Sequence, residues 1–168
     1  MTKLKNLEDL FEHELKDLYS AEKQAIEAMP KMLQQANDPQ LKQAFEAHLE
    51  ETKAQKERLD KVFELLGMSP GRKKCEAMAG LIAEGQELID EKASPEVKDA
   101  GLIATAQRIE HYEISGYGTA AHYAERLGKK DVAKLLQQTL QEEQKTDTLL
   151  NELAKNSINQ KAMAAGGK

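Results

Sequence analysis

Apolar residues recur at intervals of three and four positions along most of the chain, which is the spacing of one face of an α-helix. This pattern predicts four long helices, over residues 6–36, 38–66, 94–127 and 131–154, and a shorter helix over 75–91. The sequence therefore predicts an all-α protein without a sheet.

Residues that favour helix ends stand at the predicted boundaries. Side chains that can cap free backbone N–H groups are expected at four helix starts: Asn6, Asp38, Ser94 and Asp131. Gly67 and Gly128 follow the second and third long helices, where a left-handed residue commonly ends a helix. Pro30 lies inside the first helical pattern and predicts a kink or a short break there.

The order of these helices predicts two antiparallel hairpins joined by a long crossover that carries the short helix. This is the ferritin-like arrangement of a four-helix bundle. Residues 1–155 are expected to form this single domain. Residues 156–168 end in Ala-Ala-Gly-Gly-Lys and are expected to form a flexible tail.

Each long helix carries polar side chains inside its apolar stripe. On the third long helix, Glu110 falls near the middle of the apolar arc and Glu113 lies within it, one turn away. Burying a carboxylate is costly unless a cation or hydrogen-bond donors compensate it. The other long helices show the same anomaly at these positions: Glu22, His48, Glu51 and Glu143.

The two hairpins are expected to bring these side chains to one height. In the first hairpin, Glu22 lies level with the segment that follows Glu51. In the second hairpin, Glu113 lies level with Glu143 and Thr146. The sequence therefore predicts a cluster of carboxylates and one imidazole, His48, in the middle of the bundle.

Divalent transition metals relieve the repulsion and poor solvation of such a cluster. Oxygen ligands with an imidazole suit iron or manganese and can also hold zinc. Carboxylate-bridged di-iron bundles use this design, so two ions, with iron foremost, are expected. The candidate metal ligands are Glu22, His48, Glu51, Glu110, Glu113 and Glu143.

Other polar residues near the stripes have plainer interpretations. Glu14 is interpreted as a boundary residue whose stem packs while its carboxylate reaches solvent. Glu142 stays open between a ligand, an acceptor beside the ligands and a surface residue. Asp17 lies off the apolar face, so a structural hydrogen bond is expected. The tyrosines are interpreted as packing residues, with a redox role beside the metals as the alternative: Tyr19, Tyr112 and Tyr117.

The chain resembles the YciE/YciF-like branch of ferritin-like proteins over residues 1–160. The resemblance is carried by phrases that occur in the same order: Asp17-Leu-Tyr-Ser-Ala-Glu22, His48-Leu-Glu-Glu51, Glu110-His-Tyr-Glu113 and Glu143-Gln-Lys-Thr-Asp147. It implies a rubrerythrin-like bundle, often dimeric, that is associated with bacterial stress responses and a dinuclear metal site. Ferritins and rubrerythrins usually carry Glu-x-x-His on two helices, whereas this chain reads His48-x-x-Glu51 and Glu143-x-x-Thr146.

The net charge and the cysteine content restrict the classes of partner and the cell compartment that are expected. The formal net charge is −5, so nucleic acid and anionic membranes are not expected partners. The single cysteine, Cys75, excludes an intramolecular disulfide and fits a reducing compartment. With no signal-peptide pattern and no apolar run that could span a bilayer, a cytoplasmic protein is expected.

Two functions remain open at this point, and whether the protein is an enzyme stays open with them. The first is a metal-dependent redox or metal-handling protein, which would need an external electron donor because the chain lacks rubredoxin-like cysteine pairs. The second is a non-catalytic stress protein that binds a partner and whose metal is structural or absent. A homodimer is expected from the resemblance, with Tyr112, Tyr123 and the short helix as contact area.

Overall fold

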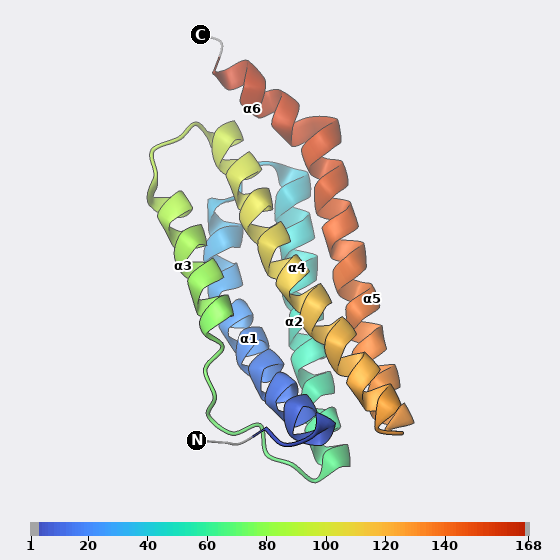
Figure 1. Ribbon diagram of the computed structural model, residues 1–168. Coiled ribbons are helices and arrows are strands. Elements are labelled where there is room, and N and C mark those ends of the chain that lie inside the picture. Colours follow the sequence, from blue (N-terminus) through green and yellow to red (C-terminus); the bar gives the residue numbers. More distant parts are fainter. Residues whose placement is uncertain (1–3, 167–168) are drawn as a thin grey trace.

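Residues 4–166 are described by the computed structural model, and their regular structure is entirely helical (Figure 1). The helices are α1 (Leu7–Gln35), α2 (Pro39–Leu66), α3 (Glu76–Asp90), α4 (Pro95–Arg126), α5 (Lys130–Leu153), the π-helical turn η1 (Ala154–Ile158) and α6 (Asn159–Ala165). The expected all-α fold, with four long helices and a short helix on the crossover between α2 and α4, is confirmed.

Most of the predicted helix ends are formed by the expected residues. The side chains of Asn6, Asp38 and Ser94 each accept a backbone N–H bond at the start of a helix. Gly67 and Gly128 adopt φ values of 64° and 71°, which a glycine reaches without a Cβ clash. The last helix differs from the prediction, because its N-cap is Lys129 and Asp131 lies in the first turn. There Asp131 acts through its charge on the helix dipole rather than as a cap.

The four long helices lie side by side, and α3 packs along the outside of α1 and α4 (Figure 1). The α1–α2 and α4–α5 pairs are the two antiparallel hairpins. Pro30 does not interrupt α1, which stays a single helix from Leu7 to Gln35. The long loop between α2 and α3 allows α4 to run beside α1.

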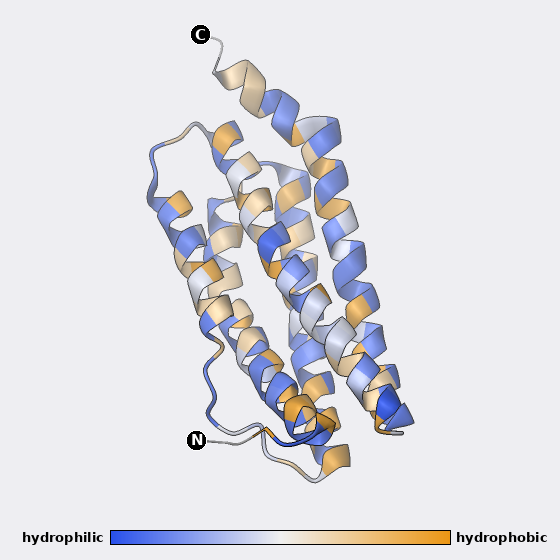
Figure 2. Cartoon of the chain, viewed as in Figure 1, coloured by the Kyte–Doolittle hydropathy of each residue, from blue (hydrophilic) through white to orange (hydrophobic). Residues whose placement is uncertain are grey.

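The apolar core consists of two clusters, one toward each end of the bundle. The first contains Met32 and Phe45 near the α1–α2 turn, and the second contains Leu15 and Leu136 near the opposite end. In α2, α4 and α5 the residues of the two clusters are separated by a stretch whose buried side chains are mostly polar, and α1 adds the buried Glu22. Orange and blue residues accordingly alternate around each long helix (Figure 2). The polar layer therefore lies between two packed apolar regions.

The chain remains helical beyond the predicted end of the last helix. The segment after α5 continues through η1 into α6, where the sequence analysis expected a tail from residue 156. Ile158 is buried in the first apolar cluster, and Lys161 Nζ lies 2.7 Å from Asp38 Oδ2 at the start of α2. These two contacts hold the segment against the bundle and favour its helical conformation. The predicted flexibility of residues 156–168 stays a prediction, and the last two of these residues, 167 and 168, lie outside the described part of the chain.

No helix within residues 4–166 combines the length and the apolar composition that a membrane crossing requires.

Candidate metal centre

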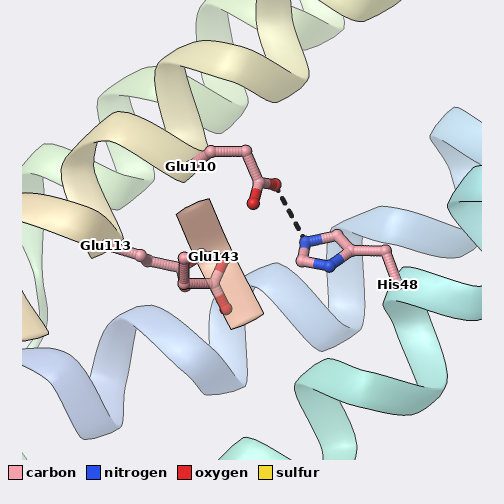
Figure 3. A group of neighbouring side chains, drawn as sticks. All are labelled: His48, Glu110, Glu113 and Glu143. Atoms are coloured by element: carbon pink, nitrogen blue, oxygen red, sulfur yellow. Dashed lines mark ion pairs between the residues drawn. The ribbon is translucent and has the colours of Figure 1, made fainter. Parts of the chain in front are cut away.

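Four buried side chains from three helices meet in the polar layer between the apolar clusters. His48 comes from α2, Glu110 and Glu113 from α4, and Glu143 from α5 (Figure 3). One ligand atom from each residue lies within 4.8 Å of the ligand atoms of the others. Their exposed fractions are 6%, 1%, 1% and 0%. The predicted meeting of acidic side chains from the second hairpin with His48 of the first is thereby confirmed in the geometry.

Helix periodicity explains why α4 contributes two of these residues. Residues three apart lie next to each other on one face of a helix. The same face of α4 carries Ala106 and Tyr117, both buried, above and below the two glutamates. Packing of these neighbours against α1 and α5 draws Glu110 and Glu113 into the interior.

Most of the polar atoms in this cluster have no hydrogen-bond partner within the described residues. Both oxygens of Glu113 and of Glu143 are in this state, as is Oε2 of Glu110. His48 Nε2 lies 2.9 Å from Glu110 Oε1, but neither nitrogen of the ring makes a hydrogen bond of good geometry. Each unsatisfied buried polar group costs about 1–3 kcal/mol. A core that keeps several such groups together has the donor set of a cation site.

Burial raises the pKa values of the clustered carboxyls. Burial is the largest cause that raises the pKa of Glu110 to about 8 and that of Glu143 to about 9, and the Glu110 carboxyl adds to the shift at Glu143. The pKa of Glu113 also lies well above its ordinary value, first through burial and then through the nearby Glu22 and Glu143 carboxyls. Without a cation these groups hold protons at neutral pH, and a bound cation would favour their ionised forms.

Glu22 of α1 lies on the edge of this cluster and is fully buried. Its Oε1 accepts a hydrogen bond from the hydroxyl of Tyr117, and its Oε2 has no partner among the described residues. Burial raises its pKa to about 8, with the Tyr117 hydrogen bond acting in the opposite direction and the Glu143 charge in the same direction. Glu22 therefore has one oxygen available for a cation beside the four clustered side chains.

Tyr117 is a residue whose role the sequence analysis missed. It is fully buried, as expected for a packing residue, but its hydroxyl donates to a candidate ligand. Its position one turn after Glu113 on the same face of α4 was a signal available in the sequence.

Glu51 stays outside the group of four. It is half-buried, and its Oε2 accepts a long hydrogen bond of 3.4 Å from Thr146 Oγ1. It lines a surface pocket together with His48. Its predicted role as a metal ligand, like that of the other five residues, stays a prediction.

The remaining candidates have protein partners of their own. Glu142 forms two hydrogen bonds with the Arg58 guanidinium, at 2.8 and 2.9 Å, and accepts another from Gln55. Burial alone would raise the pKa of Glu142, but these donors lower it. Asp17 accepts hydrogen bonds from Tyr112 and Cys75, which confirms its expected structural role.

Cys75 is fully buried in the first apolar cluster, and it also caps the start of α3. Its Sγ accepts from the backbone N–H of Met78 at the start of α3 and lies 3.0 Å from the Tyr112 hydroxyl. The half-buried Glu14 belongs to none of these groups, in keeping with a boundary position.

The donor set fits a transition metal ion. Carboxylate oxygens together with one imidazole suit iron and manganese, and zinc accepts the same ligands. The unpaired oxygens face one another instead of protein donors, which is the condition a cation would relieve.

Comparison with known proteins assigns the family. A family described as "Domain of unknown function (DUF892)" matches residues 6–163. The chain belongs to the DUF892 family. Protein YciF of Escherichia coli K12 is 51% identical over 160 residues, which make up 95% of this chain and 96% of that protein. These matches confirm the resemblance to the YciF-like proteins.

Solved structures of relatives have the same fold. The crystal structure of the E. coli stress protein YciF matches with a TM-score of 0.89 at 50% identity, over 93% of this chain and 99% of that one. YcfI of Rhodopseudomonas palustris, a proposed structural protein, matches with a TM-score of 0.87 at 45% identity, over 89% and 96%. A protein of Xanthomonas campestris with 24% identity and a TM-score of 0.73 shows the fold alone.

Proposed function

We propose that this DUF892 protein binds two divalent transition metal ions, iron foremost, in the polar layer of its bundle. The observation that carries the proposal is the set of unpaired donor atoms shared by His48, Glu110, Glu113 and Glu143. Glu22 supplies a fifth group with a free oxygen. Four carboxylates can neutralise the charge of two divalent ions, which supports a dinuclear site.

The residues have distinct parts in this proposal. The imidazole of His48 would bind an ion through a neutral ring nitrogen. The Glu110 carboxyl, which lies next to this ring, would fix the orientation of the ring. The Tyr117 hydroxyl donates a hydrogen bond to Oε1 of Glu22, and Oε2 of Glu22 would then be the oxygen that binds an ion. When bound, iron would supply a change between the ferrous and ferric states that O2 or peroxide can drive. Electrons would come from an external donor, since the single cysteine of the chain is hydrogen-bonded at the start of α3.

A role in a bacterial stress response follows in this proposal from the relationship to YciF, which is described as a stress protein. Detoxification of peroxide or sequestration of ferrous iron are the activities that a buried redox metal would add to such a response. Both would take place in the cytoplasm, and the protein would act as a homodimer.

A second candidate function has its own support. YcfI of R. palustris is described as a proposed structural protein and is 45% identical to this chain. A non-catalytic helical protein that binds a partner, with structural metal or none, is the corresponding function here. In that case the buried carboxyls would remain protonated and the protein would not respond to peroxide.

Metal analysis tests the two functions against each other. The protein is purified after expression in iron-supplemented medium, its metals are quantified, and crystals are measured on both sides of the iron absorption edge. The proposal predicts about two iron ions per chain, with anomalous peaks between His48 and Glu113. Protein that stays free of transition metal after incubation with Fe(II) or Mn(II) would exclude the metal function and support the second one.

A further inference from the structure

The candidate ligands are almost fully enclosed, so an ion needs a path to them. The exposed fractions of Glu110, Glu113 and Glu143 are 1% or less, and that of His48 is 6%. Two pockets reach this cluster from different sides of the bundle, and His48 lines both. Only the second of them has charged and hydroxyl side chains along its wall, which allows the path of an ion to be inferred.

The first pocket lies between α1, α2 and α4 and is apolar except where it meets the cluster. Its walls include Ala25, Met29, Met32 and Phe45, with His48 and Glu110 at its inner end. Its volume of about 20 Å³ has room for about one water molecule. An ion would have to shed its hydration shell against these apolar walls, which makes this pocket a poor route for a cation.

The second pocket, the α2–α5 vestibule, is larger than the first, and polar and apolar side chains both line it. It has a volume of about 190 Å³ and is lined by Ala44, Ala47, His48, Glu51, Lys145, Thr146 and Leu149. The Glu51 carboxylate and the Thr146 hydroxyl lie within 3.4 Å of each other on its wall. Oxygen atoms at this position can replace the water ligands of an incoming ion one at a time.

We propose that divalent metal ions reach the core through the α2–α5 vestibule, and that Glu51 is a transit ligand rather than a resident one. This inference rests on the proposed metal function. Glu51 is half-buried and stands outside the group of four, but its pocket reaches His48. The exposed Lys145 lines the same vestibule, so its positive charge opposes a cation on the same path.

The position of Glu51 gives a kinetic signature that a resident ligand would not give. A transit ligand stabilises an ion on its way both in and out. Its loss therefore slows association and dissociation together and leaves the dissociation constant unchanged. Loss of a resident ligand raises the dissociation constant, chiefly by speeding dissociation.

Stopped-flow mixing of the metal-free protein with Co(II) measures this signature. The chain has four tyrosines and no tryptophan, so quenching of tyrosine fluorescence reports the arrival of the ion near Tyr117. Association should be roughly tenfold slower in Glu51→Gln, and it should be faster than wild type in Lys145→Gln. The matched control is Glu50→Gln, which removes the same charge from the neighbouring residue, whose carboxylate is 72% exposed and pairs with Lys53. Glu50→Gln should associate at the wild-type rate.

The outcomes separate this inference from the function on which it rests. An unchanged association rate in Glu51→Gln, with Co(II) still bound at equilibrium, would overturn the inference that ions enter through the vestibule. The proposed metal site would not be affected by this result. Faster dissociation with a weakened equilibrium would make Glu51 a resident ligand and would also overturn the inference. Equal slowing in Glu50→Gln would attribute the effect to net charge instead. Wild-type protein that binds no Co(II) at all would remove the metal function itself.

Discussion

Glu142 and Glu143 are adjacent in the sequence, yet their carboxylates have opposite surroundings. Glu142 lies at the bundle edge against the Arg58 guanidinium, and its pKa is lowered despite partial burial. Glu143 points inward and has no hydrogen-bond partner within residues 4–166, and its pKa rises to about 9. A rotation of about 100° along the helix therefore separates a structural ion pair from a candidate ligand.

The Tyr117 hydroxyl should contribute to stability without being essential for metal binding. Tyr117→Phe leaves Glu22 Oε1 without its donor in a fully buried place. We expect the metal-free protein to lose about 1–3 kcal/mol in free energy of unfolding, measured by urea denaturation in the presence of chelator. The control is Tyr123→Phe, because the partly buried Tyr123 packs against the second apolar cluster and its hydroxyl makes no hydrogen bond within residues 4–166. Equal stabilities of the two variants would contradict the importance of the bond.

Periodicity predicted which glutamates face inward, because that depends on one helix at a time. Glu22, Glu110, Glu113 and Glu143 are all buried as expected. The partner of Tyr117 was not predictable in this way, since it depends on the height and rotation of α1 against α4. Glu51 was expected inside the stripe of its helix, but it is only half-buried and lines a surface pocket, because the periodicity of α2 does not specify its rotation within the bundle.

At the scale of the elements, α4 approaches α1 closely at Gly116. A Cβ at this position would lie 2.6 Å from Leu18 Cδ2, and Leu18 is buried in the second apolar cluster. Gly118, two residues later, would place its Cβ 3.9 Å from Leu140, which is an ordinary contact. The two glycines are therefore a matched pair on one helix.

The two substitutions should have effects of opposite sign. Gly118→Ala should raise the free energy of unfolding by up to about 1 kcal/mol, because alanine favours the helix. Gly116→Ala gains the same preference but overpacks a filled core, so we expect a net loss of about 1 kcal/mol. Thermal or urea denaturation of both variants measures the difference. A gain in both would mean that Leu18 can move aside freely.

Helix ends were predictable from the sequence where capping residues close to the end determine them. They were less predictable where contacts with distant parts of the chain determine them. Asn6, Asp38 and Ser94 cap as expected, because a cap needs only residues within one turn. The helical segment after Leu153 depends instead on the burial of Ile158 and on the ion pair of Lys161 with Asp38. No residue near it in the sequence signals those distant partners.

The anchoring of the α1–α2 turn to α4 was equally hidden from the sequence. The buried Asp99 of α4 accepts hydrogen bonds from the backbone N–H groups of Asn37 and Asp38, at 2.7 and 2.8 Å. This carboxylate ties the two hairpins together at the end of the bundle opposite the α4–α5 turn. It lies 61 and 62 residues from its partners in the chain, so only the folded arrangement shows the bond.

For the whole molecule, the buried carboxyls set the pH dependence of the metal-free protein. The pKa values of Glu22, Glu110 and Glu143 rise from 4.5 to about 8, 8 and 9, so ionising these groups opposes folding. The favourable contribution of these groups to the free energy of unfolding is fully present below about pH 4.5, and it is lost as the pH rises through 8 and 9. Three other carboxyls act in the opposite sense at acid pH, since their pKa values are lowered: Asp17, Asp38 and Glu142.

Chelated protein should therefore be most stable near pH 5 and should lose at least ~2 kcal/mol in free energy of unfolding by pH 9. Urea denaturation at pH 5, 7 and 9 in the presence of chelator measures this change. Stability that rises steadily to pH 9 would show that the buried carboxyls are already compensated within the protein.

The overall architecture followed from the sequence because few helix arrangements fit its pattern. Short turns at Asn37 and Gly128 require antiparallel neighbours, and the long segment between α2 and α4 requires a crossover. The two apolar clusters and the polar layer between them correspond to the apolar stripes of the helices and to the polar residues at the centres of those stripes. The number of ions that the layer holds depends on distances that no sequence pattern specifies.

Bound metal should reverse the effect of the buried charges, because it prefers ionised ligands and binds only the folded chain. Glu113 is the most informative position, since both of its oxygens lack partners within the described residues. Glu113→Ala should remove the stabilisation by metal. Without metal the variant should be as stable as wild type or more so, because a buried carboxyl without a hydrogen-bond partner is gone and alanine favours the helix.

The most direct test is a set of thermal melts at neutral pH of wild type, Glu113→Ala and the exposed control Glu50→Ala, each with chelator and with Fe(II) under anaerobic conditions. We expect Fe(II) to raise the melting temperature of wild type and of Glu50→Ala, and to leave that of Glu113→Ala unchanged. Equal metal-induced shifts in wild type and Glu113→Ala, or no shift in wild type, would contradict a metal site in the core. A loss of about 1–3 kcal/mol in Glu113→Ala both with and without metal would assign Glu113 a structural hydrogen bond instead.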